Sequence, residues 1–339
     1  MDLDRDANLA VQGSAAAGSM DRGNGTAPRF SSAERGLSIL LDILDELGMK
    51  ATFFVEGRTA ETIDCSCLSG HCIGLHGYDH EDLTGESTGV PMPPSAVSEA
   101  LEKGFCAVSD AVSRPVCFRA PYMACDDAVL RAVSGLGILH DSSFYSDGPK
   151  GPYATSYGIT EHPVPRGRDA AGKTIAAYLW PMHEGRRPPE DYIRFAGTAE
   201  GDFVLADHTW HMVESRGGIM DAGTASENAA RTASVLRGIL DLGFEPAILL
   251  RRLGGLSGRR PGPARRWGRK RRGLGWKSHN CSMRISSVIG IIPPIYTRAS
   301  NHSGHQQRGS KLDEIRATPG SRMRLRLCPE DIARPILDS

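Results

Sequence analysis

The chain has 339 residues, of which 40% are hydrophobic, and its 40 basic and 40 acidic side chains cancel to a formal net charge of zero. This apolar content is ordinary for a globular protein, and no apolar run approaches the roughly 18 residues of a membrane-spanning helix, so no membrane span is predicted. The N-terminal stretch MDLDRDANLA is acidic and lacks an apolar core. We therefore expect no secretory signal, a cytoplasmic location, and free thiols rather than disulfides for the 8 cysteines.

Helical and strand patterns alternate over residues 1–252. Ser31 stands three residues before Glu34, a capping-box pattern, and leucines at helical spacing then continue to Gly48. The segment ATFFVEG, residues 51–57, is short, β-branched and aromatic, which is typical of a buried parallel strand. Further strands are expected at 72–77, 116–121, 137–141, 174–180 and 203–208, and further helices at 94–112, 127–136 and 226–242. Repeated strand–helix units predict an α/β fold with a parallel sheet closed, or nearly closed, into a barrel.

The neutral total hides a division of charge. Residues 253–339 carry 18 Lys and Arg against 5 Asp and Glu, whereas 1–252 carry 22 against 35. The most basic block, 259–277, is rich in Gly and Pro and has no periodicity, which favours a disordered basic tail after a compact domain over 1–252. Such a tail can bind an anionic partner nonspecifically, and the alternative is a solvated extension with no role.

Polar residues suited to chemistry follow several of the apolar runs. His76 and His80 stand four residues apart after the run at 72–75, and imidazole nitrogen is a good ligand for Zn²⁺. Other such residues are Asp2 and Asp4 at the start of the chain, Arg119 and Tyr122 after the run at 116–118, and His208 after the run at 203–205. A parallel barrel builds its site from the C-terminal ends of successive strands, so we expect these residues to share one site.

In this order the motifs resemble those of the polysaccharide deacetylase family, the metal-dependent esterases that share the chitooligosaccharide deacetylase homology domain. Asp2-Leu3-Asp4 looks like the first motif, His76 to His80 like the second, and Arg119-Ala120-Pro121-Tyr122 like the third. His208 stands where the fifth motif has its catalytic His, and Leu179-Trp180 is a faint counterpart of the fourth. The resemblance covers about Met1 to Leu250.

The resemblance implies a fold, a cofactor and a role for each residue. The fold would be a distorted (β/α) barrel of about seven strands. One divalent metal ion, with Zn²⁺ as the first choice, would be held by Asp4, His76 and His80. Asp2 would act as general base and Arg119 would orient it. The backbone N–H of Tyr122 would hold the developing oxyanion, and His208 would act as general acid.

Two departures from the family pattern bear on this reading. The family has a Leu before the catalytic His, where it lines the acetyl pocket, but Asp207 stands there, and Asp207, Trp210 and His211 compete with His208 for the catalytic place. A barrel strand should also precede the Asp pair, yet Asp2 follows Met1 directly. We therefore expect a truncated first strand. Either the true start lies upstream, or the protein has lost a strand, which would leave open backbone edges and a gap in the core.

Three functions remain open on these grounds. The first is a metal-dependent deacetylase that removes N-acetyl groups from a sugar or polysaccharide. The second is a related hydrolase of non-carbohydrate C–N bonds, acting on a small amide. The third is a degenerate, non-catalytic barrel that binds glycan. The intact metal motifs favour the first two, and the short first strand favours the third.

Overall fold

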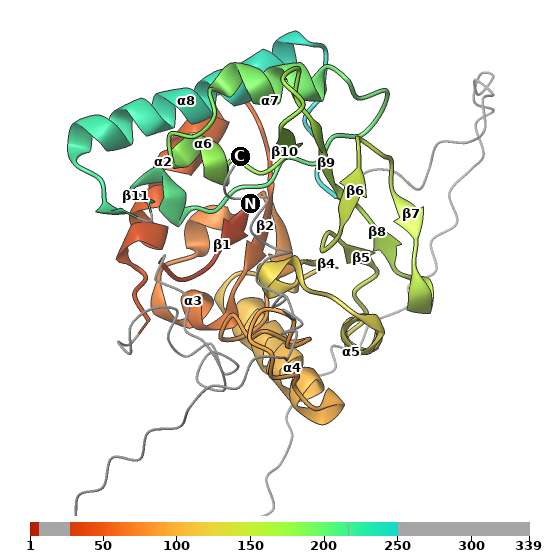
Figure 1. Ribbon diagram of the computed structural model, residues 1–339. Coiled ribbons are helices and arrows are strands. Elements are labelled where there is room, and N and C mark those ends of the chain that lie inside the picture. The colour runs from red at the N-terminus through yellow and green to blue at the C-terminus, as the bar shows by residue number, and fades with distance from the viewer. Residues whose placement is uncertain (7–27, 216, 250–339) are drawn as a thin grey trace, which may run out of the picture. The chain divides into compact units, whose positions relative to one another are not determined.

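The computed structural model describes residues 1–6, 28–215 and 217–249 (Figure 1). Two predictions concern residues outside these ranges: the domain boundary after residue 252 and the basic segment 253–339. The prediction of an anionic partner for that segment therefore stays a prediction. Among the described residues, no helix has both the length and the apolar character needed to cross a membrane.

Seven strands form the main sheet, and all but one of them are parallel. Their order is β1 (Asp2–Leu3), β2 (Thr52–Val55), β3 (Cys72–Leu75), β4 (Cys117–Phe118), β5 (His140–Asp141), β8 (Thr160–Glu161) and the antiparallel β7 (Tyr153–Ala154). A second sheet has the order β10 (Thr174–Ala176), β9 (Val164–Arg168) and β6 (Tyr145–Asp147), and β11 (Glu214–Ser215) pairs with β12 (Gly218–Ile219).

Backbone hydrogen bonds close these strands into a ring. The Asp2 N–H donates to the Asp207 carbonyl at 2.7 Å, and the Ala206 N–H donates to the Ala177 carbonyl at 2.8 Å. The Ala177 N–H in turn donates to the carbonyl of Pro165 in β9 at 2.7 Å, and β9 pairs with β6, which follows β5 in the chain. The expected α/β barrel is confirmed. It is distorted because the segment predicted as a strand at 203–208 makes only isolated bridges, at Ala206 and His208.

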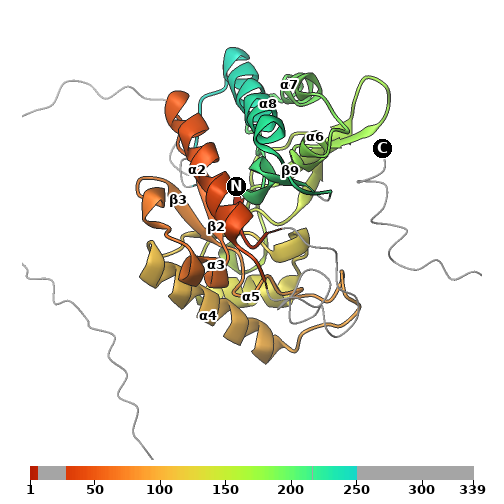
Figure 2. The ribbon, with the colours of Figure 1, turned by 90° about the vertical axis from the view of Figure 1, so that its left-hand side faces the viewer.

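Helices cover both sides of the strands. The helices are α2 (Ser31–Glu46), α3 (Gly57–Thr62), α4 (Pro94–Ala111), α5 (Asp127–Gly135), α6 (Trp180–His183), α7 (Pro189–Ala196) and α8 (Ala222–Asp241). Figures 1 and 2 show α3, α4 and α5 together below the strands, with α2, α6, α7 and α8 above them. Short 3-10 turns are η1 (Ser66–Leu68), η2 (Pro121–Met123), η3 (Ser156–Gly158) and η4 (Trp210–Met212).

The apolar core has two main parts. Leu37, Leu40 and Leu44 recur at helical spacing, so α2 presents one buried face to the strands, where Leu3 and Phe53 belong to the same cluster. The second cluster joins residues of α6 and α7 to residues of β9 and β10; its members include Met182, Tyr192, Phe195, Val164 and Ile175. The strand ends that carry the candidate site are therefore held between two packed layers.

The start of α2 differs from the predicted capping box. Ser31 is the first helical residue, and the N-cap position, Phe30, makes no side-chain cap. Asp6 caps the helix instead, because its carboxylate accepts hydrogen bonds from the Ala33 N–H at 2.7 Å and from the Ser31 hydroxyl at 3.3 Å. A carboxylate suits the positive end of a helix dipole. This contact also fixes the chain just after Asp4.

The first strand is short, as expected, but it has no open edge at Asp2. Its N–H donates to the Asp207 carbonyl, and its own carbonyl accepts from the Thr209 N–H at 3.0 Å. On the other side β1 pairs with β2 in parallel register. Asp2 is only 2% exposed. The expectation of open backbone edges around Asp2 is therefore wrong, since neighbours on both sides satisfy the backbone.

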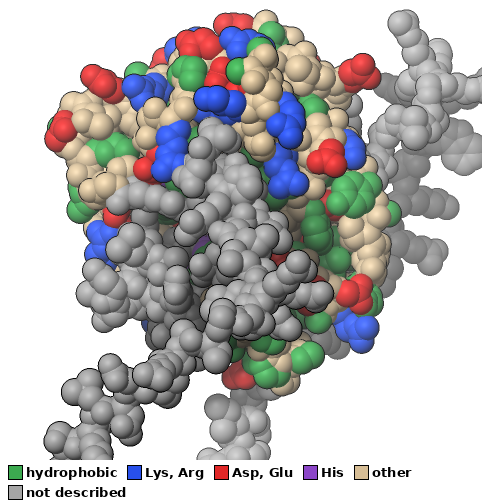
Figure 3. All heavy atoms as spheres, viewed as in Figure 1, with side chains coloured by type: hydrophobic (Ala, Val, Ile, Leu, Met, Phe, Trp, Pro, Cys, Tyr) green, Lys and Arg blue, Asp and Glu red, His purple; other side chains and the backbone are tan. Residues whose placement is uncertain are grey.

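The visible surface carries both signs of charge. On the face in Figure 3, basic and acidic side chains are interspersed over the region where Figure 1 shows α7 and α8. The acidic excess of residues 1–252 therefore does not form one continuous acidic patch on the part of this face that is described.

Candidate metal centre and active site

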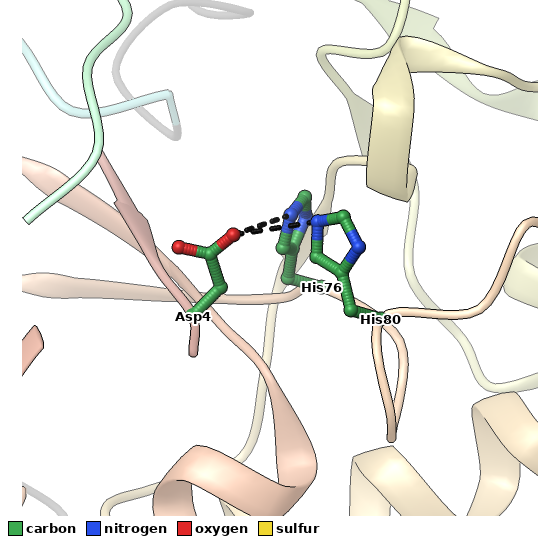
Figure 4. Close-up of side chains that lie close together, drawn as sticks. All are labelled: Asp4, His76 and His80. Carbon is green, nitrogen blue, oxygen red and sulfur yellow. Dashed lines mark ion pairs between the residues drawn. The ribbon is translucent and has the colours of Figure 1, made fainter. Parts of the chain in front are cut away.

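Three predicted metal ligands meet at the ends of β1 and β3. Figure 4 shows Asp4 facing the rings of His76 and His80. The Asp4 Oδ2 atom lies 3.3 Å from His80 Nε2 and 4.0 Å from His76 Nε2. One ligand atom from each residue falls within 4.8 Å of the others, and all three residues are buried. The chain thus gathers two imidazoles and one carboxylate around one point.

The geometry of His76 fits a metal ligand. Its Nδ1 atom lies 2.8 Å from the carbonyl oxygen of Arg119 and must donate to it, because a carbonyl can only accept. This bond leaves the unprotonated Nε2 atom facing Asp4, and Nε2 has no hydrogen-bond partner among the described residues. A second hydrogen bond that fixes the tautomer is usual for metal-bound histidine. Two His and one carboxylate match a catalytic zinc centre with open coordination positions, so these residues fit a divalent metal ion.

The loop that carries His80 is built by Glu81. The Glu81 carboxylate accepts hydrogen bonds from the backbone N–H groups of Tyr78 at 3.0 Å and Asp79 at 2.9 Å. Burial raises the pKa of Glu81, although those hydrogen bonds oppose the shift. His80 itself has φ of 54°, in the left-handed region that residues other than Gly rarely adopt. The loop therefore holds His80 in a strained conformation, which is common at functional sites.

Tyr122 lies against this loop. Tyr122 and Met123 also have positive φ, 61° and 57°, in the turn η2 that follows β4. The Tyr122 ring meets the His80 ring edge-on at 4.6 Å between centroids, and Tyr122 is 42% exposed. The turn thus places Tyr122 at the solvent side of the metal ligands.

A buried cation braces two of the ligands from behind. Arg5, next to Asp4 in the chain, is fully buried and its guanidinium pairs with both Glu56 and Asp79. Glu56 follows β2 and also accepts from the Arg5 N–H at 2.8 Å, while Asp79 immediately precedes His80. One guanidinium therefore joins the segment after β1, which carries Asp4, to the segment after β3, which carries His80. Sequence reasoning missed this group, because nothing in the local pattern pairs residues so far apart.

Asp2 is held by Arg119, as the family resemblance implied. Arg119 Nη1 donates to Asp2 Oδ1 at 2.8 Å, and both side chains are buried. Burial by itself would raise the pKa of Asp2, but the charge of the neighbouring Arg119 guanidinium outweighs burial and keeps the pKa below its ordinary value. Arg119 Nε and Nη2 also donate to the backbone oxygen and hydroxyl of Ser142, at 2.9 and 2.8 Å. Asp2 is therefore an oriented, ionised carboxylate.

Two buried carboxyl groups support the turn that holds Arg119. Asp141 accepts from the Ser143 hydroxyl at 2.5 Å, and that hydroxyl accepts from the Ala120 N–H at 2.8 Å. Glu161 is the register partner of Asp141 on the neighbouring strand β8 and accepts from the Phe144 N–H at 3.1 Å. Burial raises the pKa of both carboxyl groups, and the proximity of Asp141 raises that of Glu161 further. One proton shared by the pair would explain how two acids coexist in this buried place.

His208 faces Asp2 from the adjoining strand segment, with Tyr178 between them. The Tyr178 hydroxyl donates to Asp2 Oδ2 at 3.0 Å and lies 2.8 Å from His208 Nε2. Burial and the negative charge of Asp2 raise the pKa of Tyr178 well above its ordinary value, so its hydroxyl stays protonated. Sequence reasoning missed Tyr178. The signal in the sequence was its place within the apolar run 174–180.

Two of the competitors of His208 direct their side chains to other partners. Asp207 bonds through its side chain to His183 at 2.9 Å, and His211 Nε2 lies 3.4 Å from Glu184 Oε1. His208 Nε2, in contrast, is 3.8 Å from Asp4 Oδ2. Trp180, the faint counterpart of the fourth motif, packs edge-on against the His208 ring at 5.4 Å. Of the four candidates for the catalytic place, the structure brings His208 next to both aspartates.

Known proteins match part of the chain. Residues 32–139 match the family model described as polysaccharide deacetylase. The peptidoglycan deacetylase-like protein FGM2 of Gibberella zeae is 36% identical over 115 residues, 32% of this chain and 32% of that protein. A chitin deacetylase of Colletotrichum lindemuthianum is 33% identical over 110 residues, 29% of this chain and 41% of that protein. The matched regions thus span only about a third of the length of these curated relatives.

One solved structure also matches part of the chain. The crystal structure of a putative polysaccharide deacetylase from Mycobacterium smegmatis is 24% identical, with a TM-score of 0.42 over 66% of this chain and 84% of that one. Over residues 32–139 the chain is similar to the polysaccharide deacetylase family.

Proposed function

We propose that this protein is a metal-dependent hydrolase that removes N-acetyl groups from an acetylated carbohydrate. The convergence of Asp4, His76 and His80 at one point, with Asp2 and His208 close beside it, carries the proposal. A divalent ion such as Zn²⁺, held by the first three residues, would polarise the acetyl carbonyl and make a bound water more acidic.

Asp2 is suited to remove the proton from the attacking water. It is ionised, buried and oriented by Arg119 on one oxygen and by Tyr178 on the other. The water oxygen forms a bond to the acetyl carbon while its proton moves to the Asp2 carboxylate. Arg119 itself keeps its charge, since it donates to Ser142 and Asp2 and its pKa is raised.

His208 is suited to protonate the leaving amine. It lies on the segment beside β1, and Tyr178, Trp180 and Trp210 surround its ring. When the C–N bond of the tetrahedral intermediate breaks, its electron pair remains on nitrogen, which takes a proton from His208. The products are acetate and a free amine on the sugar.

The Tyr122 turn is suited to the developing oxyanion and to the sugar. Consecutive left-handed residues form the turn, and the Tyr122 ring packs against the His80 ring. From this turn the Tyr122 backbone N–H would donate to the carbonyl oxygen as it gains charge. The exposed Tyr122 ring offers an apolar face at the mouth of the site. Aromatic faces of this kind pack well on the C–H surface of a sugar ring.

Acetate release from N-acetylglucosamine oligomers tests the proposal, with simple linear and cyclic amides assayed alongside. We expect the zinc-loaded protein to release acetate from the oligomers, and the Asp2→Asn and His208→Ala variants to lose about a hundredfold or more in kcat. Hydrolysis of the simple amides alone would identify a C–N hydrolase outside carbohydrate chemistry. A protein that binds the oligomers but releases no acetate, with or without zinc, would be a non-catalytic glycan-binding barrel.

A further inference from the structure

A second buried cluster lies behind the acid candidate and is not used by the proposed chemistry. It consists of Asp207, His183 at the end of α6, and Asn228 of α8. His183 Nε2 lies 2.9 and 3.0 Å from the two Asp207 carboxylate oxygens, and His183 Nδ1 lies 2.8 Å from Asn228 Oδ1. The side chains of His183 and Asp207 are both 0% exposed.

Both ring nitrogens of His183 carry a proton in this arrangement. The Asn228 Nδ2 group donates to the His211 carbonyl at 2.6 Å, which turns its Oδ1 atom toward His183 Nδ1. Each nitrogen of His183 therefore faces an acceptor, so His183 is an imidazolium paired with the Asp207 carboxylate. Burial alone would lower the pKa of His183, but the charge of Asp207 and the hydrogen bonds outweigh it and raise the pKa.

The position of Asp207 links this ion pair to the site. Its backbone carbonyl accepts from the Asp2 N–H at 2.7 Å, and its side chain also accepts from the His208 N–H at 2.9 Å. The next bond in the same ladder runs from the Thr209 N–H to the Asp2 carbonyl at 3.0 Å. Because residues 203–208 form no regular strand and make only isolated bridges, the side-chain anchor adds to these few ladder bonds.

We propose that the His183–Asp207 ion pair, locked by Asn228, is a positioning element that holds His208 beside Asp2. The expected effect on kcat rests on the proposed function. The anchoring of the segment that carries His208 rests on the hydrogen bonds alone. It also explains the Asp at a place where the family pattern has an apolar residue. Here the side chain points away from the acetyl site and anchors the segment to α6 and α8.

A metal ion is the competing explanation for the cluster. His183, Asp207 and His211 also have ligand atoms within 4.8 Å of one another. However, both nitrogens of His183 are used in hydrogen bonds, and the His183 and His211 rings are stacked, with 25° between their planes. Stacked rings do not direct two nitrogen lone pairs at one ion. The hydrogen-bonded ion pair accounts for the geometry without one.

Variants of the full-length, zinc-loaded protein test the inference. Asp207→Asn keeps the size of the side chain and removes the charge. We expect kcat on N-acetylglucosamine oligomers to fall by about ten- to a hundredfold, with KM within about twofold, because a displaced acid affects the chemical step. His183→Gln should retain more kcat than His183→Ala, because the Gln amide nitrogen can reach the place of Nε2 and still donate to Asp207. Equal losses in the two His183 variants would indicate packing alone and would overturn the inference.

Hydrogen–deuterium exchange supplies a readout that does not need activity. In Asp207→Asn, the amides of the peptide around 203–212 should exchange about tenfold faster than in the unmodified protein. Asp169→Asn is the matched control, since Asp169 also accepts from a buried cation, Arg187 at 2.8 Å, but lies outside the site. Asp169→Asn should change neither kcat nor the exchange rate of the peptide around 203–212.

Three results separate the inference from its alternatives. An inactive unmodified protein refutes the proposed function, while faster exchange in Asp207→Asn still supports the anchor. Unchanged exchange in Asp207→Asn overturns the anchor whether or not the protein is active. A fall in bound zinc from about two ions per chain to one in Asp207→Asn overturns it in favour of a metal site.

Discussion

Asp2 and His208 are partners in a parallel β-bridge, although they stand far apart in the chain. Paired residues of neighbouring strands direct their side chains to the same face. The carboxylate of Asp2 and the ring of His208 therefore face the same side, as their shared contact with Tyr178 also shows. The backbone of the barrel thus sets the distance between the proposed base and the proposed acid.

Removal of the Tyr178 hydroxyl tests how much this shared contact matters. The hydroxyl bonds to Asp2 and to His208, so Tyr178→Phe leaves both without a common partner while the ring still fills its place. We expect kcat for acetate release to fall by about tenfold or more, with KM little changed, because a lost hydrogen bond to a charged group is worth about 1.5–3 kcal/mol. Steady-state kinetics on N-acetylglucosamine oligomers measures both constants.

Tyr157→Phe is the matched control for that substitution. The Tyr157 hydroxyl also bonds to a carboxylate, that of Asp127, but on the exposed surface. Its removal should leave kcat unchanged. If the two variants lose the same activity, Tyr178 has no special part in the site.

The barrel and the meeting of Asp4, His76 and His80 at one edge of it were predictable, the first from local patterns and the second from the order of the motifs. Short apolar runs such as 52–55 and 72–75 form the strands, and polar residues that end them, such as His76, fall at one edge of a parallel sheet. The periodic leucines of α2 gave that helix in the same way. A short strand and the polar residue that follows it can both be recognised from the local sequence.

The supports of the site were not predictable, because each joins residues that are distant in the chain. Asp6 caps a helix that begins at Ser31, and Arg5 is paired with Glu56 and Asp79. A single sequence carries no signal for such pairings. The segment that ends in His208 also resembled a strand because it is apolar, but it makes only isolated bridges and is held by side chains.

Zinc binding should depend on the two histidines that face Asp4. We expect the purified protein to bind about one zinc ion per chain. The His76→Ala, His80→Ala double variant should bind zinc more weakly, because it keeps one of the three proposed protein ligands. Zinc should also raise the thermal midpoint of the unmodified protein, since a ligand that binds the folded state stabilises it. Elemental analysis and thermal unfolding with added zinc measure the two effects.

His140 and His162 provide the control for the zinc experiment. Their ring nitrogens lie 3.1 Å apart, so they form a second close pair of histidines. They do not belong to a cluster of three ligands among the described residues. Their double Ala variant should bind zinc as the unmodified protein does, and equal loss in both variants would contradict the assigned ligands.

The Asp141–Glu161 pair should make stability fall as the pH rises. The pKa of each carboxyl is raised in the folded protein, so the folded state binds protons more tightly than the unfolded chain. The stabilisation is complete below the ordinary carboxyl pKa and is lost as the pH rises through the raised values. Glu161→Gln is neutral throughout and can keep the bond from the Phe144 N–H. Between about pH 5 and about pH 9, the urea midpoint of the unmodified protein should fall relative to that of the variant. Parallel midpoints across this range would show that the pair does not hold a proton.

Removal of the buried Arg5 guanidinium should destabilise the fold and weaken metal binding together. Arg5→Met leaves the buried Glu56 without its cation and Asp79 with only Arg58, and removal of one partner of a buried ion pair typically costs about 3–5 kcal/mol. Zinc affinity should fall as well, because Asp4 and His80 are the chain neighbours of Arg5 and Asp79. Arg5→Lys keeps the charge but cannot reach two carboxylates with a planar fork, so it should recover only part of both losses.

The control for this last prediction is an ion pair on the surface. Arg237 pairs with Glu46 at 2.9 Å, and the two side chains are 51% and 67% exposed. Arg237→Met should cost less than about 1 kcal/mol and leave zinc affinity unchanged, because water screens an exposed pair. Urea unfolding and zinc titration of the three variants check both quantities. If Arg5→Met lost stability but bound zinc as tightly as the unmodified protein, the buried guanidinium would brace the barrel without positioning the metal ligands.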